Sequence, residues 1–130
     1  MKTYPFIAAA MLVAVGGFAT QLALAQSGIG RAEVQRHDLP QAGREVVQVR
    51  VDFAPGAAFG AHTHPGEEVA YVLEGTLVYE LEGKTIALNA GESLYIPAGA
   101  VHAAKNVSNQ PAAELATYIV DKGKPIVATK

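Results

Sequence analysis

Histidines and a carboxylate in the middle of the chain are the residues best suited to chemistry. Two of the four histidines form His62-Thr63-His64. In an extended chain, residues two apart point to the same side, so both imidazoles can reach one point in space. Glu68 follows a Pro-Gly bend that can return its carboxylate to that point, and His102 can add a nitrogen from a neighbouring strand. These four residues predict a metal site with three nitrogen ligands and one oxygen ligand.

The absence of cysteine narrows the kind of metal site that the chain can build. It excludes disulfides, thiol nucleophiles, iron–sulfur clusters and thiolate zinc sites. Imidazole and carboxylate ligands suit divalent first-row metals better than calcium or magnesium. Fe(II) is the expected metal, with Mn, Ni, Cu or Zn as alternatives that the ligand types do not separate. Four ligands leave one or two coordination positions open, where a substrate can bind.

Other polar residues near these ligands have less specific roles. Glu67 precedes Glu68, and because strand neighbours face opposite ways, only one of the two can point at the metal. The other lies in solvent or hydrogen-bonds to a ligand histidine. Tyr79 is a candidate cavity residue. The pattern places no second acid or base in the cavity, so a mechanism has to rest on the metal, a metal-bound water or a tyrosine.

Two long motifs surround the four candidate ligands. The first reads Gly56, five residues, His62-x-His64, three residues, Glu68, six residues, Gly75. The second reads Gly91, five residues, Pro97-x-Gly99, two residues, His102, three residues, Asn106. Both strings match the two signature motifs of the cupin superfamily, in the same order. The chain therefore resembles a small single-domain cupin of the conserved-barrel type, over roughly residues 45 to 121.

The resemblance implies a fold, a site and an assembly. The fold is a double-stranded β-helix, or jelly-roll barrel, with a metal at one end of the barrel interior. The metal ligands carried over from the family are His62, His64, Glu68 and His102. The resemblance also implies a homodimer formed through an outer sheet face, where Tyr71 or Tyr118 can serve.

The elements that must position these residues are short strands. Apolar and polar residues alternate from Val46 to Phe53, which is the period of a strand with one buried face. Turn residues then separate further strands at short intervals, and no segment of the mature chain has a helical apolar period. This pattern favours an all-β sandwich or barrel. The further expected strands are 68–73, 76–81, 84–88, 92–96, 101–107 and 114–120.

The first 25 residues are typical of an export signal. Lys2 precedes the uncharged stretch from Phe6 to Ala25, which ends in Ala23-Leu24-Ala25, a small-x-small pattern for cleavage. An uncleaved membrane anchor is the alternative. We therefore expect a signal peptide at 1–25, an irregular N-terminal arm at 26–44 and a barrel domain at 45–130, located in the periplasm or secreted.

Composition excludes some partners and leaves several functions open. With 10 basic and 12 acidic residues and no run of like charge, nothing favours binding to nucleic acid or, once the signal is removed, to a membrane. A small molecule is the expected partner. We expect an exported, metal-dependent, dioxygenase-like enzyme acting on a small organic molecule. A lyase or isomerase, or a binding protein without turnover, remains an alternative.

Overall fold

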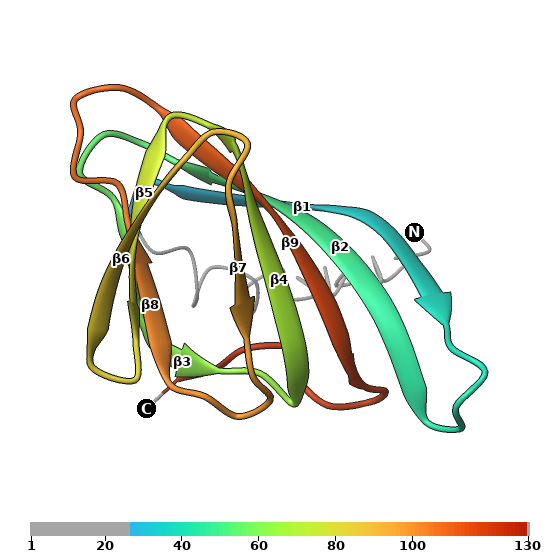
Figure 1. The fold of residues 1–130 in the computed structure, drawn as a ribbon. Helices are drawn as coiled ribbons and strands as arrows, with labels where there is room; N and C mark the ends of the chain where they lie inside the picture. Colours follow the sequence, from blue (N-terminus) through green and yellow to red (C-terminus); the bar gives the residue numbers. More distant parts are fainter. Residues whose placement is uncertain (1–26, 130) are drawn as a thin grey trace, which may run out of the picture.

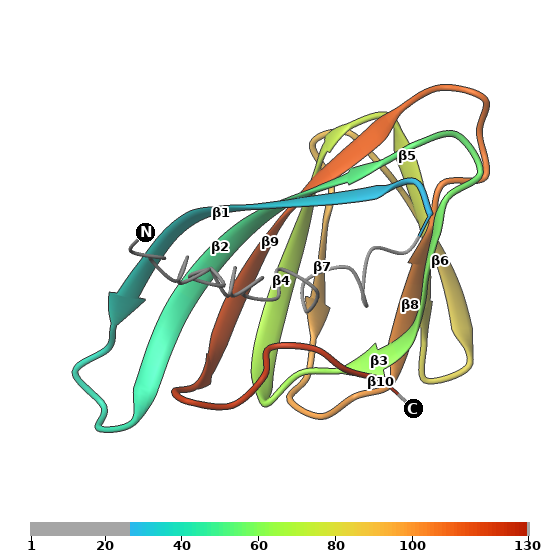
Figure 2. The same cartoon turned by 180° about the vertical axis from the view of Figure 1, so that it is seen from behind.

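The protein is built from two facing β-sheets. The structure is a computed structural model and describes residues 27–129, which contain ten strands and no helix. All strand pairs are antiparallel. The two sheets curve toward each other to form a jelly-roll barrel, as the two opposite views show (Figures 1 and 2). The predicted all-β barrel is confirmed.

Each sheet has five strands, and both mix strands from distant parts of the sequence. The first sheet has the order β1 (Ile29–Asp38), β2 (Arg44–Phe53), β9 (Ala112–Asp121), β4 (Gly66–Glu74), β7 (Ser93–Ile96). The second has the order β10 (Ala128–Thr129), β3 (Ala58–Thr63), β8 (His102–Lys105), β5 (Thr76–Leu81), β6 (Lys84–Asn89).

Alternating apolar residues build the core between the sheets, as the period of two predicts. On β2, every second residue from Val47 to Phe53 is buried, and these side chains pack with residues of the other strands. On β4 the alternation brings Ala70 and Val72 inside, and on β5 it brings Leu77 and Tyr79 inside. The barrel interior is therefore apolar except where the candidate ligands and a few other polar groups enter it.

Residues 29–38 of the expected irregular arm form a regular strand. β1 pairs with β2 through nine residue pairs, with a bulge at Val34. β1 lies at the edge of the sheet, and its side chains are exposed almost throughout. A strand without a buried face carries no apolar period, so its sequence gives no strand signal. The expectation of irregular structure was wrong for this reason.

Two further strands, β3 and β10, were not predicted. In β3 the register to β8 shifts between Phe59 and His62, although both residues are buried. A bulge of this kind adds a residue and breaks the alternation on which strand prediction depends. β10 is a short pairing of two residues against the end of β3.

The predicted signal segment, residues 1–25, lies outside the described residues. Within residues 27–129, no helix has the length and apolar character needed to cross a membrane.

Candidate metal centre

Three strands and one crossing segment bring the four predicted ligands together at one end of the barrel. His62 lies on β3 and faces His102, its register partner at the start of β8. His64 lies just after β3, where the chain crosses from the second sheet to the first, and Glu68 lies on β4. From residue 62 to residue 72 every even-numbered residue is buried, so parity points His62, His64 and Glu68 inward together.

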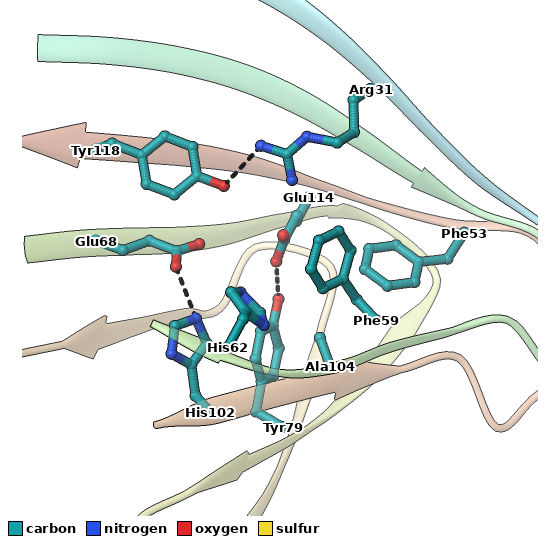
Figure 3. A pocket seen from close by; sticks show the side chains of 10 residues that line it. All are labelled: Arg31, Phe53, Phe59, His62, Glu68, Tyr79, His102, Ala104, Glu114 and Tyr118. Carbon is teal, nitrogen blue, oxygen red and sulfur yellow. Dashed lines mark hydrogen bonds and ion pairs between the residues drawn. The ribbon is translucent and has the colours of Figure 1, made fainter. Parts of the chain in front are cut away.

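The ligand atoms of these residues converge. His62, His64 and His102 each offer one nitrogen, and the three nitrogens lie within 4.8 Å of one another. The Glu68 Oε2 atom lies 2.9 Å from His64 Nε2 and 3.1 Å from His102 Nε2. All four residues are buried. Figure 3 shows Glu68 and His102 facing each other across this end of the cavity, with His62 beside them.

Backbone carbonyls fix how each imidazole is presented. The Nδ1 atoms lie 2.7 Å from the Gly60 oxygen in His62, 2.6 Å from the Ile126 oxygen in His64, and 3.0 Å from the Ala100 oxygen in His102. A carbonyl oxygen only accepts, so each Nδ1 carries the hydrogen. A neutral imidazole then presents a bare Nε2 lone pair to the centre, which is the arrangement that a metal-binding histidine needs.

The polar atoms of this centre are better satisfied by a metal cation than by the contacts that they make with one another. His64 Nε2 is buried and has no hydrogen-bond partner, although Glu68 Oε2 is near it. Two lone pairs at this separation repel unless a cation or a proton lies between them. The donor set of three imidazoles and one carboxylate is chemically suited to a divalent transition metal. A metal ion held by these atoms would satisfy all of them at once.

Burial and close contacts act in opposite directions on the pKa values of the candidate ligands. Burial lowers the pKa of His102, but the hydrogen bonds to Glu68 and to the Ala100 carbonyl, with the negative charges of Glu68 and Glu114, together outweigh burial and leave that pKa above its usual value. Burial raises the pKa of Glu68, yet its contacts with His102 and His64 bring it down to about 2. For His62, burial dominates and lowers the pKa to about 4. Glu68 is therefore a carboxylate and His62 a neutral imidazole at neutral pH.

A narrow cavity extends from the ligands into the barrel, and the space that it encloses is about 10 Å³, close to that of one water molecule. His62, Glu68 and His102 form its outer end, and Phe53, Phe59 and Ala104 contribute apolar wall. Tyr79 lines the cavity, as proposed from its position on the inner face of its strand. Its hydroxyl donates to a side chain, Glu114, in a short hydrogen bond. A ligand larger than water therefore binds at the outer end of the cavity or displaces side chains of its wall.

Sequence reasoning missed an acidic residue in the cavity, Glu114 on β9. It is buried and lines the same space as the candidate ligands (Figure 3). Burial, together with the charge of Glu68, raises the pKa of Glu114 to about 7. The sequence signal is weak, because β9 carries apolar residues on both faces, with Leu115 and Ile119 beside Ala116 and Tyr118. The prediction that the cavity holds no second acid or base was therefore wrong.

A cation also enters the cavity, from the segment that was expected to be an arm. Arg31 of β1 donates to the Tyr118 hydroxyl at 3.3 Å, and its guanidinium lies 5.6 Å from the Phe59 ring centre. Among the ion pairs of residues 27–129, none involves Arg31. Its remaining donor hydrogens are thus available to an anion at the cavity.

The remaining polar residues singled out in the sequence have structural roles. Glu67 points away from the ligands and pairs with Arg44 at 2.7 Å. Asn106 is fully buried and donates to the Gln110 oxygen at 2.7 Å, so it fastens local backbone. Tyr118 lies inside the barrel, with its ring 4.7 Å from that of His64, which corrects its expected place on an outer dimer face.

Comparison with known protein families supports the same interpretation of the fold. The cupin domain model matches residues 49–118, more than half of the chain. The chain is a cupin. Solved cupin structures share its fold, and the crystal structure of a polyketide cyclase from Streptomyces resistomycificus superposes with a TM-score of 0.62 and 25% identity, covering 79% of this chain and 71% of that one.

Relatives identified by sequence cover only part of this cupin. A probable germin-like protein of Arabidopsis thaliana is 40% identical over 75 residues, which are 53% of this chain and 35% of the relative. An oxalate-binding protein of Thermotoga maritima is 33% identical over 72 residues, 55% of this chain and 60% of that protein. The chain thus spans about a third of the germin-like relative.

Proposed function

We propose that this cupin is a metal-dependent enzyme that acts on a small organic acid able to chelate the metal. One observation carries the proposal: three imidazoles, each fixed by a backbone carbonyl, direct Nε2 toward one point beside a buried carboxylate. We assign His62, His64, Glu68 and His102 as the ligands. Four protein ligands leave coordination positions that face the cavity for the substrate.

The cavity supports a small anionic substrate. The cavity is narrow, so it favours a substrate of few non-hydrogen atoms. Arg31 has donor hydrogens left over and can pair with a carboxylate or enolate oxygen. The similarity to a protein named for oxalate binding and to one named as a polyketide cyclase agrees with ligands that present neighbouring oxygens.

The bound metal would supply Lewis acidity, and dioxygen chemistry if it is Fe(II). The residues of the chain would do the rest. Arg31 would orient the anion, while Phe53 and Phe59 exclude water from the inner cavity. Both dioxygenase-like turnover and lyase or isomerase turnover are compatible with these roles. Dioxygen consumption by the Fe(II)-loaded protein, measured over a panel of phenols, thiols, sugar acids and dicarboxylates, separates the two classes.

Metal analysis tests the ligand assignment directly. Protein purified without chelators is expected to hold about one transition metal ion per chain, and addition of metal is expected to raise its melting temperature because the folded state alone binds it. His62→Ala is expected to lose both effects. His37→Ala, on exposed β1, is the control and should keep them. Equal metal content in His62→Ala and the unmodified protein would show the assignment to be wrong.

A second candidate function is binding of the same class of ligand without turnover. The similarity to an oxalate-binding protein is the observation that favours it. Calorimetry with oxalate on the metal-loaded protein distinguishes the two. Tight binding without conversion of any compound in the panel would favour the binding protein over the enzyme.

A further inference from the structure

Glu114 occupies the inner end of the cavity, away from the metal ligands. On the β4–β9 pair, Glu68 lies opposite Tyr118, whereas Glu114 lies opposite Val72, four residues further along the strand. In the second sheet, Tyr79 and Ala104 pair in the same inner layer. The cavity therefore runs from the metal-ligand layer to an inner layer that contains one carboxyl group, and Figure 3 shows the two layers side by side.

This carboxyl group is buried and makes no ion pair at contact distance. Glu114 is 5% exposed, and none of the ion pairs found in residues 27–129 includes it. Its side chain accepts one short hydrogen bond, from the Tyr79 hydroxyl. Burying an acid in this way is costly, and an apolar residue would fill the same space at lower cost. A carboxyl that opens onto a ligand cavity under these conditions is a candidate acid–base group.

We propose that Glu114 is the general acid–base of the site and that Tyr79 is its positioning residue. The proposal rests on the proposed function, because it requires a ligand held at the metal end of the cavity. It adds a reaction class, namely proton transfer at a carbon next to a carbonyl group. Small 2-oxo acids suit this class. Their carboxylate and keto oxygens can both face the ligand layer, and the adjacent carbon reaches Glu114 once the side chains that narrow the cavity move aside.

The proposed step needs no oxidant or reductant. The Glu114 carboxylate takes a proton from the carbon next to the keto group. The electron pair of that C–H bond forms a C=C bond, and the carbonyl π electrons move onto the keto oxygen, giving an enolate. Glu114 then returns a proton to the same carbon, and the C=O bond forms again. In D₂O the returned particle is a deuteron, so the net result is exchange of hydrogen for deuterium.

Several ionisable groups set the protonation of Glu114. Burial has the largest effect and favours the neutral acid, and the negative charge of Glu68 acts in the same direction. Arg31, His102 and the Tyr79 hydrogen bond favour the carboxylate. The ionisable or charged groups around this end of the cavity come from five other strands and from β9 itself: Arg31, His62, Glu68, Tyr79, His102 and Tyr118.

Deuterium exchange into pyruvate tests the proposal, with the full chain loaded with Zn(II) as a diamagnetic metal. Loss of the methyl signal in proton NMR is expected to be faster with the Zn(II)-loaded protein than with the chelator-treated protein, and faster at high pH, where Glu114 is ionised. Glu114→Gln keeps the shape of the side chain and is expected to lower the exchange rate by about 100-fold or more. Glu114→Asp keeps the carboxyl group and should lose less.

The control is Glu80→Gln, the same change at an exposed residue next to Tyr79 on β5. It should leave exchange unchanged. Zn(II) content is measured for every variant. A Glu114→Gln protein that binds Zn(II) and exchanges at the rate of the unmodified protein overturns the proposal. So does an unmodified protein that binds Zn(II) without accelerating exchange, a result that leaves the metal centre intact. Failure to bind any metal overturns the proposed function instead, and this proposal with it.

Tyr79→Phe tests the positioning role. Its hydrogen bond favours the ionised form of Glu114, so its removal should shift the midpoint of the exchange–pH profile to higher pH. A purely structural role would lower the rate at all pH values without moving the midpoint, and that result would contradict the assignment of Tyr79.

Discussion

At the scale of single residues, the centre depends on the hydrogen bond that Nδ1 of each imidazole makes, because this bond orients the ring and its Nε2 atom. The three Nδ1–H groups donate to carbonyls of residues 60, 126 and 100, which belong to three different turns or segments. Two of these carbonyls lie two residues before their histidine, so the local backbone itself sets the ring. His64 instead depends on the C-terminal segment at Ile126, far away in the sequence. Ligand spacing in the sequence therefore predicts which residues converge, whereas the ring orientation also requires the tertiary fold.

Glu114 should also affect stability, and the direction depends on pH. Burial raises its pKa from 4.5 to about 7, so the folded chain holds this proton more firmly than the unfolded chain. Below about 4.5 the acid is neutral in both states. As pH rises from there through about 7, the unfolded chain gives up the proton first, and the Glu114 contribution to the free energy of unfolding decreases.

Replacement of Glu114 by Gln removes this titration. Urea unfolding of chelator-treated protein is expected to show Glu114→Gln gaining stability relative to the unmodified chain between pH 5 and pH 8. The other ionisable groups titrate in both proteins and cancel in the difference. Glu80→Gln should show no such trend, since Glu80 is exposed. A stability difference that is the same at both pH values would contradict the raised pKa of Glu114.

At the scale of elements, the junction between β4 and β9 positions the ligand segment. Gly66 opens β4 opposite Val120, between His64 and Glu68 in the sequence. A Cβ atom at Gly66 would lie 2.0 Å from the Ile119 oxygen and 2.7 Å from the Val120 Cα, both of which are backbone atoms. The two strands approach so closely that only glycine fits, and this approach sets where the chain turns toward Glu68.

Gly66→Ala is therefore expected to be destabilising. The added methyl group has to push β4 away from β9, which should lower the free energy of unfolding by about 1–3 kcal/mol or more. Because Glu68 moves with β4, metal affinity should fall as well. Chemical denaturation and metal titration measure the two effects. Gly30→Ala is the matched control, because its Cβ would meet only the Asp52 Cβ, at 3.7 Å. Equal loss in both variants would show that close approach at Gly66 is not the cause.

The elements also show which parts of this fold a sequence can predict. β2 alternates apolar and polar residues along its length, and β2, β5 and β9 were expected close to their observed bounds. β1 has no buried face and β3 contains a bulge, so neither carries that period. The same difference explains which cavity residues were predicted. The motif spacing identified the four candidate ligands. Arg31 was missed because β1 has no apolar period, and Glu114 because it is an acidic residue on a mostly apolar strand.

At the scale of the whole molecule, we propose that the protein is exported by a signal at residues 1–25, which lie outside the described residues. If residues 1–25 are a cleaved signal, the full chain expressed in a bacterium is expected to accumulate in the periplasmic fraction, with Gln26 as its first residue. Intact-mass measurement of the purified protein gives the position of cleavage. Replacement of Ala25 by a bulky residue should block processing, whereas the same change at Ala32 should not. A full-length mass in a membrane fraction would instead favour the uncleaved anchor.

The outer face of the first sheet is where we expect a second copy of the chain to bind. Tyr71 on β4 is 43% exposed and Tyr95 on β7 is 59% exposed, and Val69, register partner of Tyr95, is exposed between them. Apolar side chains gathered on one sheet face favour association, because contact removes them from water. The face lies on the side of the sheet opposite the cavity, so a dimer would leave the metal centre accessible.

Light scattering on the metal-loaded protein tests this assembly. The unmodified chain is expected to have the mass of a dimer, and the double substitution Tyr71→Glu and Tyr95→Glu the mass of a monomer, because two buried charges would face their own copies across a symmetric interface. Val34→Glu, also an exposed apolar residue but on β1, should remain dimeric. Retained metal content in the monomer would show that each barrel builds its centre alone, as the four ligands within one chain imply. Dissociation by Val34→Glu, with the tyrosine variant still dimeric, would place the interface at β1 instead.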